Sequence, residues 1–235
     1  MESNNTINSH LLKLGGIAGI VAGLCVLSFA LISQIKGILF TPEVFDGKSI
    51  EPWLQHLNES PQLVKLIPIL PIIGFSCMLV FGIVLYQKIE EKTWQKSLAL
   101  VGYLIGVPIA VSTFVSHFSF VNELLSFSTT TPEMINQIQV LAAFKMHHYM
   151  TINFAIGPLF IIVIGNSFMA WAALKAGILP KWVCYWAFFN GSLIFLGIIS
   201  VFFPIFRLSQ IGGPLTMLWF LTSGIILIRK NNLLN

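Results

Sequence analysis

Histidine is the residue type in this chain that is best able to carry chemistry, because charged residues are few. Four of the five histidines lie near the ends of apolar segments, at His56, His117, His147 and His148. Two imidazoles that face each other could ligate a haem iron axially. With His56 or Glu123 they could bind zinc or another transition metal. No HExxH motif or metal-ligand spacing accompanies them, so histidines that bond to backbone or to lipid headgroups are the simpler interpretation.

Helical spacing groups one of these histidines with small and polar residues. The positions 4, 7, 11 and 14 residues before His117 hold, in that order, Thr113, Ala110, Gly106 and Tyr103. A stripe of this kind is typical of a helix face that points into a bundle. We therefore expect this face to be buried.

The same counting from His148 reaches Thr151 and Asn166 on one helix face. If both faces point inward, His117 and His148 approach each other across the bundle, while His147 must point elsewhere because it is the neighbour in sequence. This arrangement predicts a pocket for a small molecule or a lipid. The candidate ligand-binding residues are His117, His148, Thr113, Thr151 and Asn153, and the weaker candidate metal ligands are His117, His147 and His148.

Two asparagines, Asn166 and Asn190, lie deeper in two apolar segments that a short connection joins. Segments joined in this way are antiparallel neighbours, and the two asparagines lie at similar depths. We predict that their side chains form a polar interhelical pair, whose hydrogen bond would contribute about 0.6 kcal/mol. The alternative is that each side chain bonds to a carbonyl group of its own helix.

The elements that must position these residues are transmembrane helices. Hydrophobic residues make up 56% of the chain, charged residues make up 9%, and the mean hydropathy is +0.84. A typical soluble domain has about 25% charged residues, so a soluble enzyme, a nucleic-acid binder and a disordered chain are excluded. Six apolar segments approach the length of about 20 residues that a crossing needs. They are residues 14–35, 64–86, 97–120, 149–173, 182–203 and 211–228, and none contains an acidic residue.

These segments predict an all-α polytopic membrane protein, with one six-helix transmembrane domain over residues 1–235. Two outer connections are long enough for short amphipathic helices on the membrane surface. In the first, Ser49 caps a helix that carries Leu54 and Leu57 and ends at Pro61. In the second, a helix starts at Thr131. Its apolar face consists of Ile135, Ile138, Leu141 and Ala142.

The orientation follows from the basic residues. With six spans, both termini share one side, and 8 of the 13 lysines and arginines fall there against 5 on the other side. The positive-inside rule therefore predicts that both termini lie in the cytoplasm, and we expect a multi-pass protein of the cell inner membrane. The eight are Lys13, Lys88, Lys92, Lys96, Lys175, Lys181, Arg229 and Lys230.

The first segment carries Gly15, Gly19 and Gly23 at strict four-residue spacing. Small residues at this period let another helix approach closely, either within the same chain or in a homodimer. Prolines interrupt four of the other segments and can bend helices around a binding cavity. They are Pro68, Pro71, Pro108, Pro158 and Pro214.

Three stretches give the chain a resemblance to a known family. Residues 15–20 (GGIAGI), residues 174–182 (LKAGILPKW) and residues 228–230 (IRK) resemble the first helix, an inner loop and the end of the last helix of the bacterial six-span proteins classed as domain of unknown function 4386. The resemblance covers most of the chain by layout. It implies the six-span architecture and supplies no activity.

The sequence thus predicts an integral membrane protein of unknown activity that binds a lipid or an apolar small molecule in its bundle, with membrane lipids as partners and no nucleic acid. The first alternative is a haem- or metal-dependent oxidoreductase that uses His117 and His148. The second alternative is a small-molecule transporter. No catalytic constellation is present, because Ser116 is only the sequence neighbour of His117 and no third member of a triad accompanies them.

Overall fold

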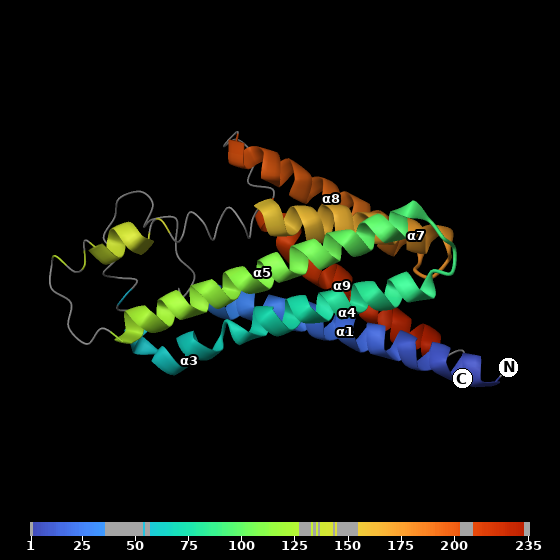
Figure 1. Ribbon diagram of the computed structural model, residues 1–235, viewed down its shortest axis with the longest axis horizontal. Coiled ribbons are helices and arrows are strands. Elements are labelled where there is room, and N and C mark those ends of the chain that lie inside the picture. The colour runs from blue at the N-terminus through green and yellow to red at the C-terminus, as the bar shows by residue number, and fades with distance from the viewer. Residues whose placement is uncertain are drawn as a thin grey trace.

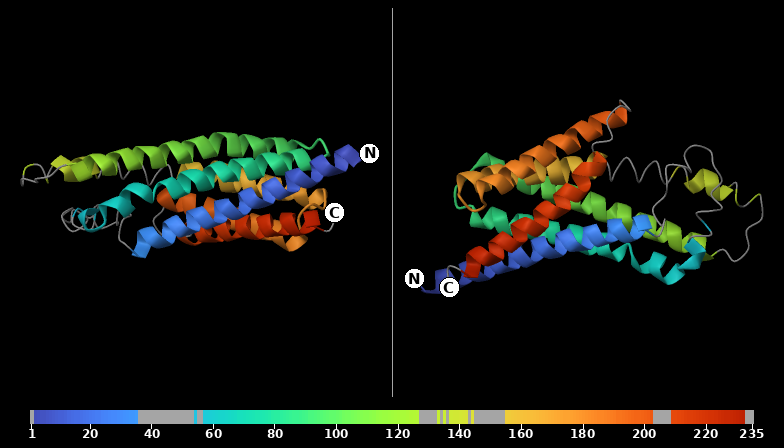
Figure 2. Two further views of the ribbon diagram at one scale, coloured as in Figure 1. Left: turned by 90° about the horizontal axis from the view of Figure 1, so that it is seen from below. Right: turned by 180° about the vertical axis from the view of Figure 1, so that it is seen from behind.

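The computed structural model describes residues 2–35, 54, 57–126, 133, 135, 137–142, 144, 155–202 and 209–232. Five long helices run along one another, as Figures 1 and 2 show: α1 (Glu2–Ile35), α4 (Ile69–Lys88), α5 (Trp94–Ser126), α8 (Lys181–Phe202) and α9 (Ser209–Asn232). Both chain termini lie at one end of this bundle (Figure 1). We call this end of the bundle the terminal end and the opposite end the distal end.

Five helical segments are long and apolar enough to cross a membrane: His10–Ile35, Pro61–Lys88, Trp94–Leu125, Lys181–Ile199 and Ile211–Asn232. A shorter apolar helix covers Leu159–Lys175. These helices correspond to the six segments predicted from the sequence, although the start of the fourth segment, residues 149–154, lies outside the described residues. The chain is therefore an α-helical membrane protein, and the part that the structure describes contains no strand.

The glycine stripe of α1 lies against helices of the same chain. A methyl group built at Gly23 would lie 2.6 Å from the backbone oxygen of Met217 on α9. One built at Gly19 would lie 2.9 Å from the backbone oxygen of Phe220 and 2.9 Å from the Phe81 ring on α4. Gly15 faces Val84 of α4. The intramolecular alternative is therefore realised, because α4 and α9 pack on this face, and the homodimer through Gly15, Gly19 and Gly23 stays a prediction.

The fourth apolar segment is wound partly as a π-helix. This π-helix, η3 (Leu159–Asn166), begins directly after Pro158 and continues as α7 (Ser167–Lys175). The Ser167 hydroxyl donates to the backbone oxygen of Ile162, five residues back, at 3.2 Å. π-Helical turns are rare and are frequently found at functional sites, so η3 makes this part of the bundle a candidate location for a functional site.

A second cluster of apolar side chains lies apart from the main core. Its buried residues come from α1, from α3 (Pro61–Leu66) and the residues on either side of it, from α5 and from the helical residues near 138. They are Phe29, Leu57, Val64, Ile67, Phe114, Phe120, Val121, Leu124, Ile138 and Ala142. The two predicted amphipathic segments thus pack against the ends of α1 and α5.

Two details of those segments differ from the prediction. Pro61 was expected to end a helix, but it begins α3, because proline is tolerated in the first turn, where its missing N–H needs no partner. Leu141 was expected on the buried face, but 47% of its surface is exposed, whereas Ile138 and Ala142 are buried. Residues 138 and 142 are four apart and share one face of the helix, and Leu141 lies beside that face. Ser49 lies outside the described residues.

Candidate functional site

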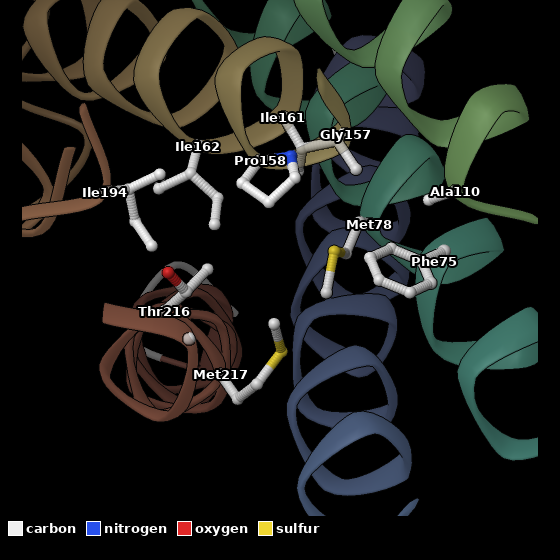
Figure 3. A pocket seen from close by; sticks show the side chains of 11 residues that line it. Phe75, Met78, Ala110, Gly157, Pro158, Ile161, Ile162, Ile194, Thr216 and Met217 are labelled. Carbon is white, nitrogen blue, oxygen red and sulfur yellow. The ribbon is translucent and has the colours of Figure 1, made fainter. Parts of the chain in front are cut away.

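A cavity of about 110 Å³ lies in the bundle where five helical segments meet. It is lined by Phe75 and Met78 of α4, Ala110 of α5, Gly157, Pro158, Ile161 and Ile162 of the fourth segment, Ile194 of α8, and Gly213, Thr216 and Met217 of α9. Figure 3 shows these side chains around a common space. Helices far apart in the sequence therefore enclose one pocket.

The walls of the cavity are apolar. Among the residues that the structure describes, Thr216 is the only lining residue with a polar side chain, and its hydroxyl oxygen lies 2.9 Å from the backbone oxygen of Gly212. In Figure 3 the Thr216 oxygen points away from the Met78 side of the space, and the methyl group lies nearer to it. Met78 and Met217 form part of the wall from opposite helices, and methionine side chains adapt easily to the shape of an occupant. The site can hold an apolar group without offering it a hydrogen bond.

Local backbone chemistry explains why there is space here. Gly157 and Gly213 line the cavity without a side chain, and a methyl group built at Gly213 would meet no atom within 4 Å. Pro158 directly precedes the eight-residue π-helix η3. The neighbouring Gly212 has no such freedom, because a methyl group there would lie 2.5 Å from the Ile194 side chain. Gly213 is thus the wall position at which a larger side chain would enter the cavity.

One buried polar cluster holds the cavity wall that α8 and α9 form. In the amide orientation that satisfies both of its side-chain atoms, Asn190 donates to the Gly212 backbone oxygen at 2.9 Å, and its oxygen accepts from the Thr216 hydroxyl at 2.5 Å and from the Thr216 backbone N–H at 3.1 Å. Only 1% of the Asn190 surface is exposed. Asparagine and threonine therefore satisfy each other where no water is available.

A second polar bond joins α5 to η3. The Tyr103 hydroxyl donates to the side-chain oxygen of Asn166 at 2.5 Å, and both residues are buried. The sequence predicted that Asn166 would bond to Asn190. A bond between these two is not among the hydrogen bonds of the described residues, and each has a partner on another helix: Tyr103 for Asn166 and Thr216 for Asn190. Asn166 and Asn190 nevertheless lie at a similar height along the bundle, because their sequence neighbours Ser167 and Gly191 are in contact.

The predicted inward face of α5 is confirmed. His117, Thr113, Ala110, Gly106 and Tyr103 are all buried, and Ala110 lines the cavity. The Thr113 hydroxyl donates to the backbone oxygen of Ile109 at 2.8 Å, so its hydrogen is used within its own helix. This stripe leads from the Tyr103–Asn166 bond past the cavity to His117.

Several candidate residues lie outside the part of the chain that the structure describes. They are His56, His147, His148, Thr151 and Asn153. The predicted approach of His117 to His148 therefore stays a prediction. Among the described residues no group of three histidine, cysteine or acidic side chains is placed to hold a metal ion.

Sequence reasoning missed most of the cavity wall. Ile161, Ile162, Ile194, Met78 and Met217 are ordinary apolar residues, and no spacing distinguishes them from lipid-facing ones. The usable signal was the set of prolines, because Pro158 lines the cavity and Pro214 follows the lining residue Gly213.

At the terminal end, two of the stretches noted in the sequence meet. The Lys230 ammonium group near the end of α9 donates to the backbone oxygen of Gly177 at 3.0 Å and to that of Ile178 at 3.5 Å, in the turn between α7 and α8. Gly177 has a φ of +63°, a conformation that glycine adopts without strain. Further along, Gly16 of the first stretch lies against the backbone of Gly224. These contacts tie the first, fourth, fifth and sixth apolar segments together.

The comparisons with known proteins agree with this architecture. No curated protein and no solved structure matches the chain. Residues 21–228 match the family described as domain of unknown function DUF4386. Because the match covers most of the sequence, the chain belongs to the DUF4386 family of membrane proteins.

Proposed function

We propose that the protein binds an apolar molecule in the cavity between α4, α5, η3, α8 and α9. The observation that carries this proposal is the lining that the described residues form, which consists of apolar side chains, two glycines and one threonine whose hydroxyl donates to Asn190. Cavities with such walls stay free of water and accept apolar guests, as an apolar cavity of about 150 Å³ accepts benzene. A cavity of about 110 Å³ suits a small apolar group or one part of a larger molecule.

We further propose that both termini lie in the cytoplasm and that the membrane is the bacterial inner membrane. The support is the distribution of basic residues, with eight of the 13 at the side of the termini, together with the positive-inside rule. In this orientation the second apolar cluster and the helical residues near 138 lie on the outer side.

The test is retention of a ligand by the purified protein. Wild-type protein, Gly213→Leu and Ser192→Leu are washed in the same detergent and extracted, and the apolar molecules in the extracts are quantified by mass spectrometry. A leucine at Gly213 adds a side chain at a lining position with open space around it, whereas Ser192 is exposed on α8. We expect one compound to be retained by wild type and Ser192→Leu and lost from Gly213→Leu.

A further inference from the structure

We propose that the cavity takes the tail end of a long-chain amphiphile, and that it selects the chain and not the headgroup. This inference rests on the proposed function and names the class of ligand. Two observations carry it: the depth of the cavity in the bundle and the apolar side chains that the described residues contribute to its wall.

The depth follows from the positions of the lining residues within their helices. Met78 is the 18th of the 28 residues of Pro61–Lys88, and Ala110 is the 17th of the 32 residues of Trp94–Leu125. The backbone of Met217 lies against Gly23, which is the 14th of the 26 residues of His10–Ile35. The lining residues of α4 and α5, together with the level at which α9 meets α1, thus place the cavity near the middle of the span.

A site at this depth is far from both headgroup layers. The hydrocarbon core is about 30 Å thick, so its middle lies about 15 Å from either layer. A ligand anchored by its headgroup in either leaflet can reach the cavity only with the far end of its chain. Among the described lining residues, a ligand with a polar group inside the cavity would find no free side-chain donor, because the Thr216 hydroxyl already donates to Asn190, and an unpaired polar group in an apolar site is costly.

Compact apolar molecules are the alternative class of guest. They fit the chemistry of the wall equally well. However, they move freely throughout the membrane core, and nothing aligns them with the helices before they bind. A chain held at its headgroup is already aligned along the helices, so less ordering is needed when its end enters. The membrane itself supplies such chains next to the bundle.

The experiment uses the full chain in nanodiscs that contain a trace of photoreactive lipid. Two pairs of probes are compared: phosphatidylcholine and phosphatidylglycerol, each with a diazirine either at the chain end or beside the ester. After illumination, cross-linked residues are mapped by mass spectrometry. We expect Met78, Met217 and Ile162 to be labelled by both chain-end probes to the same extent, and about tenfold less by either probe with the diazirine beside the ester.

The variants Gly213→Ala and Gly213→Leu provide the matched control. Both place a side chain before Pro214, which disfavours the helical conformation of the preceding residue, but only leucine fills the cavity. Leucine should lower the labelling of the cavity residues about tenfold and leave that of the exposed Leu196 on α8 unchanged, whereas alanine should largely preserve both. Unequal labelling by the two headgroups, or equal labelling by the two diazirine positions, would overturn the inference.

The two proposals fail in different ways. If the compact probe xenon occupies the cavity of wild type but not of Gly213→Leu, and the chain-end probes do not label it, the proposed function stands and the tail inference is wrong. If neither xenon nor any chain-end probe enters the cavity, both are wrong.

Discussion

Tyr103 on α5 donates a hydrogen bond of 2.5 Å to the side-chain oxygen of Asn166 on η3. Neither side chain is more than 1% exposed, so water cannot replace either partner. The bond lies at the last residue of the π-helix, where the chain returns to α-helical winding in α7. It therefore fixes the segment that forms one wall of the cavity against α5.

Loss of this bond should destabilise the protein. In Tyr103→Phe the ring still packs against Gly82 and Gly165, but the Asn166 oxygen loses its donor. We expect the free energy of unfolding in mixed micelles to fall by about 1 kcal/mol. Tyr185→Phe is the control, because 58% of the Tyr185 surface is exposed and its loss of a hydroxyl should have no measurable effect. Equal stability of the two variants would contradict the assigned role.

Asn190 and Thr216 should be energetically coupled. The variants Asn190→Leu and Thr216→Val each remove one side of their hydrogen bond, and the double variant removes both. Because each single change leaves a buried polar group with fewer partners, the double variant should be more stable than the sum of the single effects predicts, by about 0.6 kcal/mol. A double-mutant cycle of unfolding free energies measures this term, and a coupling of zero would show that the two side chains act independently.

The glycines of α1 should be intolerant of a methyl group because of contacts within one chain. In Gly23→Ala the new methyl would lie 2.6 Å from the Met217 backbone oxygen, so α1 and α9 must separate. We expect a loss of about 1–3 kcal/mol in unfolding free energy, as for other overpacked sites. Gly213→Ala, which meets no atom within 4 Å, should lose much less. A dimer lost from Gly23→Ala while the monomer keeps its stability would point to an interface between copies instead.

The orientation makes a separate prediction. A fluorescent protein fused after Asn235 should fold and fluoresce in bacteria, and alkaline phosphatase fused at the same point should be inactive, because the C-terminus is expected on the cytoplasmic side. Active phosphatase with a dark fluorescent fusion would reverse the orientation. That result would leave the cavity unaffected, since the cavity lies near the middle of the span.

The helices could be predicted from the sequence because the membrane imposes a simple rule. Every backbone group inside it must be bonded within a helix or a closed sheet, so long apolar segments without acidic residues report the spans directly. The inward face of α5 was predictable for a similar reason. Its small and polar residues, from Tyr103 to His117, recur at helical spacing, and that period places them on one side.

The cavity could not be predicted in the same way. Its wall is formed by residues such as Ile194 and Met217, which resemble lipid-facing residues. Within the membrane core, side chains that face the bundle interior and side chains that face lipid are both apolar, so the sequence does not distinguish them. The partners of Asn166 and Asn190 were missed for a related reason. Each asparagine could reach several helices, and depth along the chain does not show on which side of its helix a residue lies.

The most direct test of the central claim is the amount of ligand retained by Gly213→Leu relative to Gly213→Ala and wild type. The three proteins are purified in parallel from the same membranes, and the retained apolar compound is quantified per mole of protein. We predict that wild type and Gly213→Ala retain it near one equivalent and that Gly213→Leu retains about tenfold less, a difference of about 1.4 kcal/mol in binding. Equal retention by all three proteins would contradict the claim that this cavity is a binding site.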